Sequence, residues 1–214
     1  MVKLHAFAQS GNCYKVALML DLLGQPWEPV LIDFFGGQTR SVQYRESVNE
    51  LGEAPVLDDG VLRLTQSGVI LTHLARKHGR FGGEGEAQQR EVLRWLLYDN
   101  HKFTSYFATY RFLYSLAEAA PDPAVMNFLR QRFETAFGVA DRHLQQSDFV
   151  VGDAPTIADF SMCGYLFYPV EESGCDVRAR YPAIGKWLER IQALHGWRDP
   201  YDCLPGERIP PRKR

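Results

Sequence analysis

N-E-L-G-E-A-P-V-L-D-D-G-V-L-R-L-T-Q-S-G-V-I, residues 49–70, is the stretch that decides the fold of the first part of this chain. Residues 56–57 and 61–64 are short apolar-rich runs, and the turn between them contains Asp59-Gly60. Asp-Gly supplies the positive-φ residues of a tight turn, so the two runs are predicted to form a β-hairpin. A helix over 67–78 is expected to follow and to end at a glycine.

The residues before this hairpin alternate between strand and helix patterns. Short strands are expected at 3–7 and 28–34, and a weak helix is expected near 42–48. Between the two strands, residues 13–23 carry apolar side chains at the i, i+3, i+4, i+7 spacing of a helix face. Leu18 lies off that face, which predicts a helix that is buried on more than one side. The order strand, helix, strand, hairpin, helix is typical of a thioredoxin-like α/β domain.

The second part of the chain has a different pattern. Residues 79–86, G-R-F-G-G-E-G-E, form a glycine-rich polar break, and strand patterns nearly vanish after it. Helices are expected at 86–117, 122–147, 156–170 and 182–195. We therefore expect a thioredoxin-like domain over 1–80, an all-α domain over 87–200, and a proline-rich basic tail over 201–214.

Composition argues against several classes of function. The net charge of −2 does not favour a broad nucleic-acid-binding surface. No segment reaches the roughly 18 consecutive apolar residues of a membrane span, and the first residues lack the layout of a signal peptide. We therefore expect no membrane partner and a cytoplasmic location. The four cysteines form no C-x-x-C pair and no cluster with histidine, so no metal site is expected.

Four short motifs carry a more specific signal. They are S-G-N-C-Y-K-V at 10–16, N-E-L-G-E-A-P-V at 49–56, Q-S-G-V-I at 66–70 and G-D-A-P-T-I-A-D at 152–159. Each motif alone is weak, but in this order and at these separations they resemble the glutathione transferase superfamily over nearly the whole chain. The chain is most similar to cytosolic, bacterial-like members of the serine or threonine type. The resemblance implies a thioredoxin-like α/β domain followed by an all-α domain.

The resemblance also implies a site, with glutathione as co-substrate. Ser10 is implied as the catalytic residue, because its hydroxyl and nearby helix N–H groups face the bound thiolate. The residues implied in glutathione binding are Asn12, Arg40, Ala54, Pro55, Gln66 and Ser67. Ala54 is expected to pair its main chain with the cysteinyl unit, and Gln66 with Ser67 to hold the γ-glutamyl carboxylate at a helix N-terminus. Arg40 is the basic group expected near the glycyl carboxylate.

Some residues in the same motifs have competing interpretations. Ser10 and Asn12 can simply cap a helix, and Ser67 can be an ordinary N-cap. Cys13 lies in the first helical turn, where a thiol pKa can be lowered, but a small, half-buried structural residue is the favoured interpretation. Glu50 departs from the family pattern by replacing its usual proline, and Glu53 places an acid near an anionic ligand.

The helical half offers further candidates. Thr156 and Asp159 form an S/T-x-x-D capping box, which is a folding element and not a general base. Asp99 is interpreted either as a surface acid or as a ligand to glutathione bound in a partner subunit. An aromatic-rich stretch lies where the family walls the electrophile pocket, although core packing is an alternative for each member: Tyr98, His101, Phe103, Tyr106, Phe107, Tyr110, Phe112 and Tyr114.

Three functions are compatible with these motifs. The first is a glutathione transferase in which Ser10 activates the thiolate for attack on a hydrophobic electrophile. The second uses the same site for dehalogenation, ether cleavage, isomerisation or peroxide reduction. The third is a non-catalytic interaction module with this fold. The resemblance also implies a homodimer.

Overall fold

The computed structural model describes residues 1–212, and the chain divides into two compact units. The first, called the sheet unit, contains residues 1–80 and 195–208. The second, called the helical unit, contains residues 81–194 and 209–212. The sequence interpretation ended the first domain at residue 80, whereas the structure adds a distant segment to it. Each unit is described by itself below.

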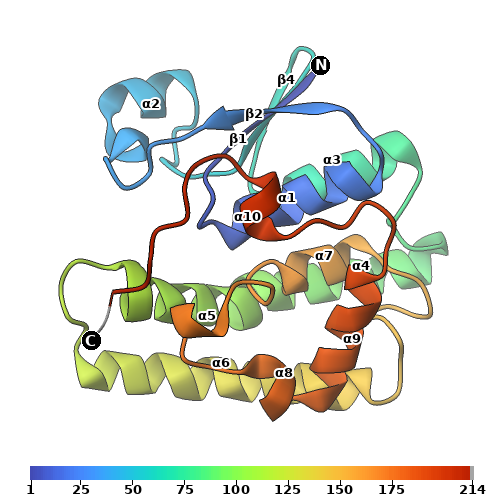
Figure 1. The fold of residues 1–214 in the computed structure, drawn as a ribbon. Helices are drawn as coiled ribbons and strands as arrows, with labels where there is room; N and C mark the ends of the chain where they lie inside the picture. Colours follow the sequence, from blue (N-terminus) through green and yellow to red (C-terminus); the bar gives the residue numbers. More distant parts are fainter. Residues whose placement is uncertain (213–214) are drawn as a thin grey trace. The chain divides into compact units, whose positions relative to one another are not determined.

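A four-stranded mixed sheet forms the centre of the sheet unit (Figure 1). The strand order is β2-β1-β3-β4, with β1 parallel to β2 and antiparallel to β3. The strands are β1 (Val2–Ala6), β2 (Trp27–Leu31), β3 (Val56–Asp59) and β4 (Leu62–Thr65). The predicted hairpin is β3 and β4, which turn at Gly60 with a φ of +65°. The thioredoxin-like α/β prediction is confirmed.

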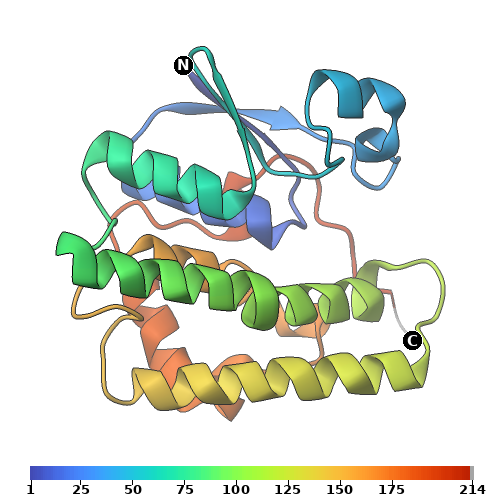
Figure 2. The same cartoon turned by 180° about the vertical axis from the view of Figure 1, so that it is seen from behind.

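Two helices lie side by side on one face of this sheet, α1 (Gly11–Leu22) and α3 (Ser67–His78) (Figures 1 and 2). Ten of the twelve residues of α1 are buried, which confirms the prediction of a helix buried on more than one side. The short elements η1 (Gln38–Arg40) and α2 (Val42–Ser47) lie in the connection between β2 and β3. Helix α2 is the weak helix expected near 42–48.

A segment near the end of the chain folds back onto the sheet unit. It contains α10 (Pro200–Cys203), which packs against α1. The Arg198 carbonyl accepts a hydrogen bond of 2.8 Å from the Tyr14 hydroxyl, and the Arg198 guanidinium lies 2.7 Å from the Asp21 carboxylate. The segment from Arg198 to Cys203 is therefore held on the sheet unit, whereas the sequence analysis placed the start of a proline-rich basic tail at residue 201. Lys213 and Arg214 of that predicted tail lie outside the described residues.

The helical unit begins with one long helix, in which four elements follow without a break. They are α4 (Gly85–Tyr98), the π-helical η2 (Asp99–Phe103), α5 (Thr104–Arg111) and the π-helical η3 (Phe112–Leu116). Helix α6 (Pro123–Leu144) lies alongside it (Figure 2). The remaining elements are α7 (Ile157–Cys163), η4 (Val170–Glu172), α8 (Val177–Arg180) and α9 (Pro182–Gln192). The all-α prediction is confirmed, although α7 ends at Cys163, with Gly164 as its C-cap, and is shorter than the 156–170 expected.

Aromatic side chains form the core between the long helix and α6. The Phe103 and Phe107 rings lie 4.6 and 5.2 Å from the Phe137 ring, and the Tyr110 ring lies 5.0 Å from the Phe133 ring, as centroid distances. Core packing is therefore the correct interpretation for three of the eight aromatic-stretch residues. The two π-helical segments add residues to their turns, so the side chains that follow them are rotated about the helix axis.

Within residues 1–212, no helix combines the length and the apolar character that crossing a membrane requires.

Candidate active site

The register of the sheet brings the predicted site loops to one end of it. His5 pairs with Val56, and Val56 pairs with Thr65, so these three residues lie side by side across the sheet. The Ser10 loop follows β1 at this end of the sheet, the 54–55 segment precedes β3 there, and α3 begins there after β4. Strand β2 is parallel to β1, so the loop that carries Arg40 leaves from the same end.

Ser10 is the N-cap of α1. Its backbone is extended (φ −91°, ψ 106°), its Oγ accepts a hydrogen bond of 3.2 Å from Cys13 N, and the residue is 5% exposed. A hydroxyl has one donor and two acceptor positions, so the capping bond leaves the hydroxyl hydrogen for a further acceptor. Capping and thiolate binding are thus compatible roles. Asn12, in the first turn, is half-buried and makes no side-chain hydrogen bond within residues 1–212.

Cys13 is fully buried, whereas the sequence analysis expected a half-buried residue. Burial raises the pKa of the Cys13 thiol to about 11, and the smaller opposing effects come from the Ser10 hydroxyl and the Phe7 backbone. A thiol with this pKa is neutral near pH 7, and a neutral thiol is a poor nucleophile. Cys13 is therefore a structural residue of α1.

The loop before β3 is fixed by two hydrogen bonds to one carbonyl group. The Asn49 side-chain amide and the Tyr44 hydroxyl each donate to the Glu53 carbonyl, both at 2.9 Å. The Ala54–Pro55 peptide is cis, and within residues 1–212 the main chain of Ala54 makes no hydrogen bond. The loop therefore presents Ala54 with a free donor and acceptor. The sequence analysis missed Tyr44, because nothing in its local pattern indicates a contact nine residues away.

The start of α3 is strained at one residue. Gln66 has a φ of +66°, a left-handed value that costs a non-glycine residue about 1–3 kcal/mol and that often marks a functional position. Gln66 is the N-cap, and Ser67 is the first helical residue, so the interpretation of Ser67 as the N-cap is wrong. The first helical hydrogen bond runs from Ile70 N to Gln66 O. The N–H groups of the preceding residues are available to an anion.

Gln66 also contacts the loop before β3. Its side-chain amide donates a hydrogen bond of 2.8 Å to the Glu53 carboxylate, and both side chains are exposed. Arg40 is the last residue of η1 and is exposed, and its guanidinium makes no ion pair within the described chain. Its role toward a carboxylate stays a prediction.

Two acids of the helical unit are structural. Asp99 is fully buried and accepts hydrogen bonds from the Thr104 and Ser161 hydroxyls, so it is neither a surface acid nor a ligand that can reach a partner subunit. Asp159 is also fully buried, and it forms the predicted capping box with Thr156 at the start of α7. Its interpretation as a folding element agrees with this geometry.

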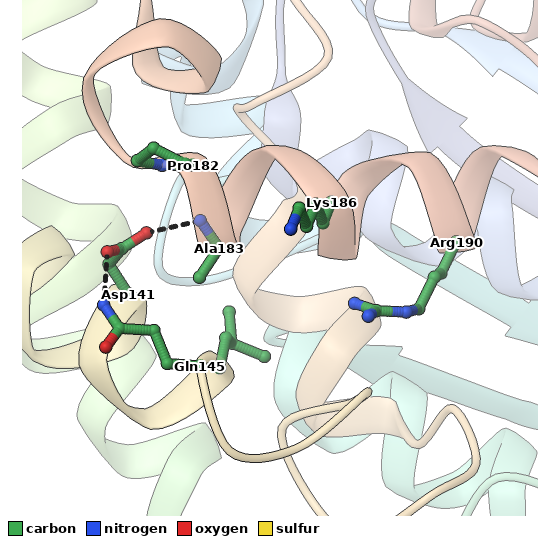
Figure 3. A pocket seen from close by; sticks show the side chains of 7 residues that line it. Asp141, Gln145, Pro182, Ala183, Lys186 and Arg190 are labelled. Atoms are coloured by element: carbon green, nitrogen blue, oxygen red, sulfur yellow. Dashed lines mark hydrogen bonds between the residues drawn. The ribbon is translucent and has the colours of Figure 1, made fainter.

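A pocket of about 310 Å³ in the helical unit lies between α6 and α9 (Figure 3). The Asp141 carboxylate in it accepts hydrogen bonds from Ala183 N and Ile184 N, at 2.8 and 3.1 Å, and thereby caps the start of α9. Arg190 at the other end is paired with Asp148 at 2.7 Å. The Asp141 and Arg190 side chains thus already serve the fold.

Comparisons with known proteins agree with this arrangement. The family model for the glutathione S-transferase N-terminal domain matches residues 4–85, and that for the C-terminal domain matches residues 103–195. A crystal structure of a glutathione S-transferase from Xanthobacter autotrophicus Py2 is 30% identical, with a TM-score of 0.84 and coverage of 92% of this chain and 96% of that chain.

Two further proteins show the same likeness. A glutathione S-transferase structure from Pseudomonas fluorescens Pf-5 is 32% identical, with a TM-score of 0.80 over 90% of this chain and 94% of that one. A probable glutathione S-transferase of Oryza sativa subsp. japonica is 27% identical over 203 residues, covering 90% of this chain and 91% of its own length. The chain therefore belongs to the glutathione S-transferase family and is an enzyme of that family.

Proposed function

We propose that this chain binds glutathione at the end of the sheet where β1, β3 and β4 meet their loops, and that Ser10 activates the bound thiol. The thiolate then attacks a hydrophobic electrophile. The observation that carries the proposal is the position of the Ser10 hydroxyl at the N-terminus of a buried twelve-residue helix, with its own hydrogen available. Partial positive charge at such a helix end favours an anion.

The rest of the site suits the other parts of the tripeptide. Ala54 offers its main chain to the cysteinyl unit, and Pro55 fixes the start of β3 beside it. The start of α3, at Gln66 and Ser67, offers N–H groups to the γ-glutamyl carboxylate. Arg40 is the basic group offered to the glycyl carboxylate, and Asn12 offers a side-chain amide near Ser10.

Two acceptors compete for the Ser10 hydrogen, the Cys13 sulfur and the ligand sulfur, and the ligand sulfur is the stronger one. The nearby Cys13 sulfur is held neutral because burial raises its pKa to about 11. An anionic sulfur accepts a charge-assisted hydrogen bond, which is roughly twice as strong as a neutral one. The hydroxyl is therefore expected to turn toward the glutathione thiolate when glutathione is bound.

Ionisation accounts for only part of the rate. A free thiol has a pKa of about 8.5, and lowering it by about two units stabilises the thiolate by about 2.7 kcal/mol and raises its fraction at pH 7 some twentyfold. The more stable thiolate is less nucleophilic, and a Brønsted slope of about 0.4–0.5 removes most of that gain. Most of the acceleration must therefore come from positioning the electrophile against the sulfur.

The test is an ultraviolet difference titration with reduced glutathione near pH 7, for the wild-type chain and for Ser10→Ala. Thiolate absorbance that appears in the wild type and disappears in the variant is the expected result. Glutathione that binds with the same absorbance in both proteins would remove Ser10 from the mechanism. Product analysis with an electrophile then distinguishes conjugation, which leaves a stable thioether, from other glutathione chemistry.

The proposal includes a homodimer, as is typical of the family. Leu93 and Leu97 lie one turn apart on α4 and are 56% and 62% exposed, which is unusual for leucine pairs without a partner surface. Sedimentation equilibrium that gives a mass near 24.4 kDa would contradict the dimer.

A further inference from the structure

We infer that Gln9 is a positioning residue for Ser10: its side chain binds a main-chain carbonyl of the C-terminal segment, and this bond holds the Ser10 hydroxyl in line with the glutathione thiolate. The C-terminal segment consists of residues 195–208, which belong to the sheet unit. The inference rests on the proposed function and extends it, because it adds a residue that acts on the thiolate only through Ser10.

Gln9 lies in a tight turn that ends at Ser10. The Ser10 N–H group donates a hydrogen bond of 3.2 Å to the Phe7 carbonyl, so Ala8 and Gln9 are the two central residues of this turn. Ala8 is fully buried, and Gln9 is 5% exposed. The orientation of the turn therefore sets the position of the Ser10 side chain, which comes directly after it.

The buried Gln9 amide has a partner in the C-terminal segment. Its Nε2 atom donates a hydrogen bond of 2.7 Å to the Glu207 carbonyl. Because a buried amide is costly without a hydrogen bond, this contact fixes the Gln9 side chain and, with it, the second central residue of the turn. The acceptor is a main-chain atom, so its position is set by the path of the C-terminal segment and not by the side chain at residue 207.

The C-terminal segment also contacts the other central residue of the turn. Gly206 has a φ of +101°, and a β-carbon at this position would lie 3.9 Å from the Ala8 β-carbon and 3.2 Å from the Leu31 side chain. Glycine therefore suits both the backbone conformation and the close approach. Farther back, the Tyr14 hydroxyl holds the segment on α1 through the Arg198 carbonyl. Both central residues of the turn thus contact a segment that is itself anchored.

Ser10 needs this support because its own capping contact defines its position weakly. The hydrogen bond from Cys13 N to Ser10 Oγ is 3.2 Å, which is at the long end of the usual range. A hydrogen bond weakens steeply when it is misaligned, and catalytic groups must be held within about 0.5 Å of their productive geometry. Loss of the Gln9 bond is therefore expected to leave Ser10 as a helix cap but to weaken its contact with the thiolate.

The experiment measures thiolate absorbance against pH for the whole chain at saturating glutathione, so that a change in affinity does not affect the signal. Gln9→Met keeps the length of the side chain and removes its donor. Gly206→Ala displaces the C-terminal segment instead, because alanine disfavours this φ and its β-carbon meets Leu31. Each variant is expected to raise the midpoint of the thiolate titration by about half a pH unit, which lowers the thiolate fraction about threefold on the acid side of the midpoint.

Gly60→Ala is the matched control. Gly60 has a φ of +65°, so alanine causes a similar backbone strain there, but a β-carbon at Gly60 meets no atom within 4 Å. The control should leave the midpoint unchanged, and urea denaturation of all variants shows how much stability each one loses. A purely structural contact between Gln9 and Glu207 would lower stability without moving the midpoint.

A double variant tests whether the two substitutions act on one contact. Gln9→Met combined with Gly206→Ala should shift the midpoint no further than Gln9→Met alone. A shift equal to the sum of the two single shifts would contradict the inference, because the two residues would then act independently.

The remaining outcomes separate the inference from the function on which it rests. A wild-type midpoint in the folded variants, or an equal shift in Gly60→Ala, would mean that the Gln9 contact serves only the fold, while the proposed function would stand. If Gly206→Ala does not fold, the midpoint of Gln9→Met decides. A wild-type chain that shows no thiolate absorbance below the pH at which free glutathione ionises would overturn the proposed function itself.

Discussion

Helices α1 and α7 both begin at a hydroxyl residue, but the two starts differ in how many hydrogen-bonding groups they leave available. At α1, Ser10 Oγ accepts one bond from Cys13 N and retains its hydrogen. At α7, the Asp159 carboxylate accepts four bonds, from Val150 N, Thr156 N, the Thr156 hydroxyl and the Trp187 indole. The comparison teaches that an N-cap residue can also bind a ligand when one of its hydrogen-bonding groups is unused. A helix start whose hydrogen-bonding groups are all used contributes only to the fold.

Disrupting the start of α7, where all of these hydrogen-bonding groups are used, should lower the free energy of unfolding more than disrupting the start of α1. Asp159→Ala leaves four buried donors without an acceptor, so we expect a loss of about 3–5 kcal/mol in the free energy of unfolding. Burial already raises the pKa of this carboxyl despite its hydrogen bonds, which shows how fully it is removed from water. Urea denaturation measures the loss. Asp153→Ala, which changes an exposed acid six residues earlier, should cost less than about 0.5 kcal/mol.

Substitution of Ser10 at the start of α1 should lower the stability of the protein only slightly but abolish the thiolate absorbance of bound glutathione. Ser10→Ala removes one capping bond, so we expect a loss of about 1 kcal/mol in the free energy of unfolding. The matched control is Asp122→Ala, because Asp122 caps α6 through a bond to Ala124 N and lies in the helical unit. Both variants should lose similar stability, and only Ser10→Ala should lose thiolate absorbance. Equal absorbance in the two variants would mean that Ser10 is a cap and nothing more.

A smaller effect is expected at the β3–β4 hairpin at acid pH. The hydrogen bond from Arg63 lowers the pKa of Asp58, with a further contribution from His5. The stabilisation from this depressed pKa is present above the usual carboxyl pKa of about 4 and is lost as pH falls through the lowered folded-state value. Arg63→Gln should therefore reduce stability above pH 4 by less than about 1 kcal/mol, because the pair is partly exposed, and should flatten its decline on acidification.

The measurement is urea denaturation at a series of pH values, from neutral pH to well below the usual carboxyl pKa of about 4. Arg90→Gln is the control, since Arg90 pairs with Glu86 on an exposed helix face. A control variant that flattens the acid decline as much as Arg63→Gln would refute the assignment to Asp58.

The smallest effect is expected for Cys13, which lies in the first turn of α1 but is not expected to take part in thiolate formation. Cys13→Ala should leave the glutathione thiolate absorbance unchanged, because burial raises the pKa of Cys13 to about 11 and keeps it neutral. The difference titration described for Ser10 gives the answer. Loss of the signal in Cys13→Ala, with glutathione binding intact, would make Cys13 part of the activating machinery.

Much of the fold was predictable because local patterns and tertiary structure agree. The Asp59-Gly60 turn and the apolar face of residues 13–23 each predicted an element that the structure contains. The aromatic stretch was not predictable in the same way, because two π-helical segments shift the helical period. The packing of α10 against α1 joins parts of the chain that lie far apart in sequence, and no local pattern encodes such a contact.

The candidate site was only partly predictable, for a related reason. The motifs named Ser10 and Gln66, but their surroundings depend on contacts across the sheet. The burial that makes Cys13 inert and the hydrogen bond that joins Glu53 to Gln66 appear only when the chain is folded. A sequence indicates which chemical groups are present. How many hydrogen-bonding positions each group has left for a ligand depends on how the folded chain packs around it.

The hydrogen bond of 2.7 Å from the Gln9 side chain to the Glu207 carbonyl joins residues 198 positions apart, one of them directly before Ser10. At a synthesis rate of about 5–20 residues per second, residue 207 is added about 10–40 s after Gln9. The loop that holds the reactive hydroxyl therefore gains this contact only after residue 207 has been synthesised. A nascent chain that stalls before residue 207 should have a folded sheet and a loop that exchanges its amide hydrogens faster than in the finished protein.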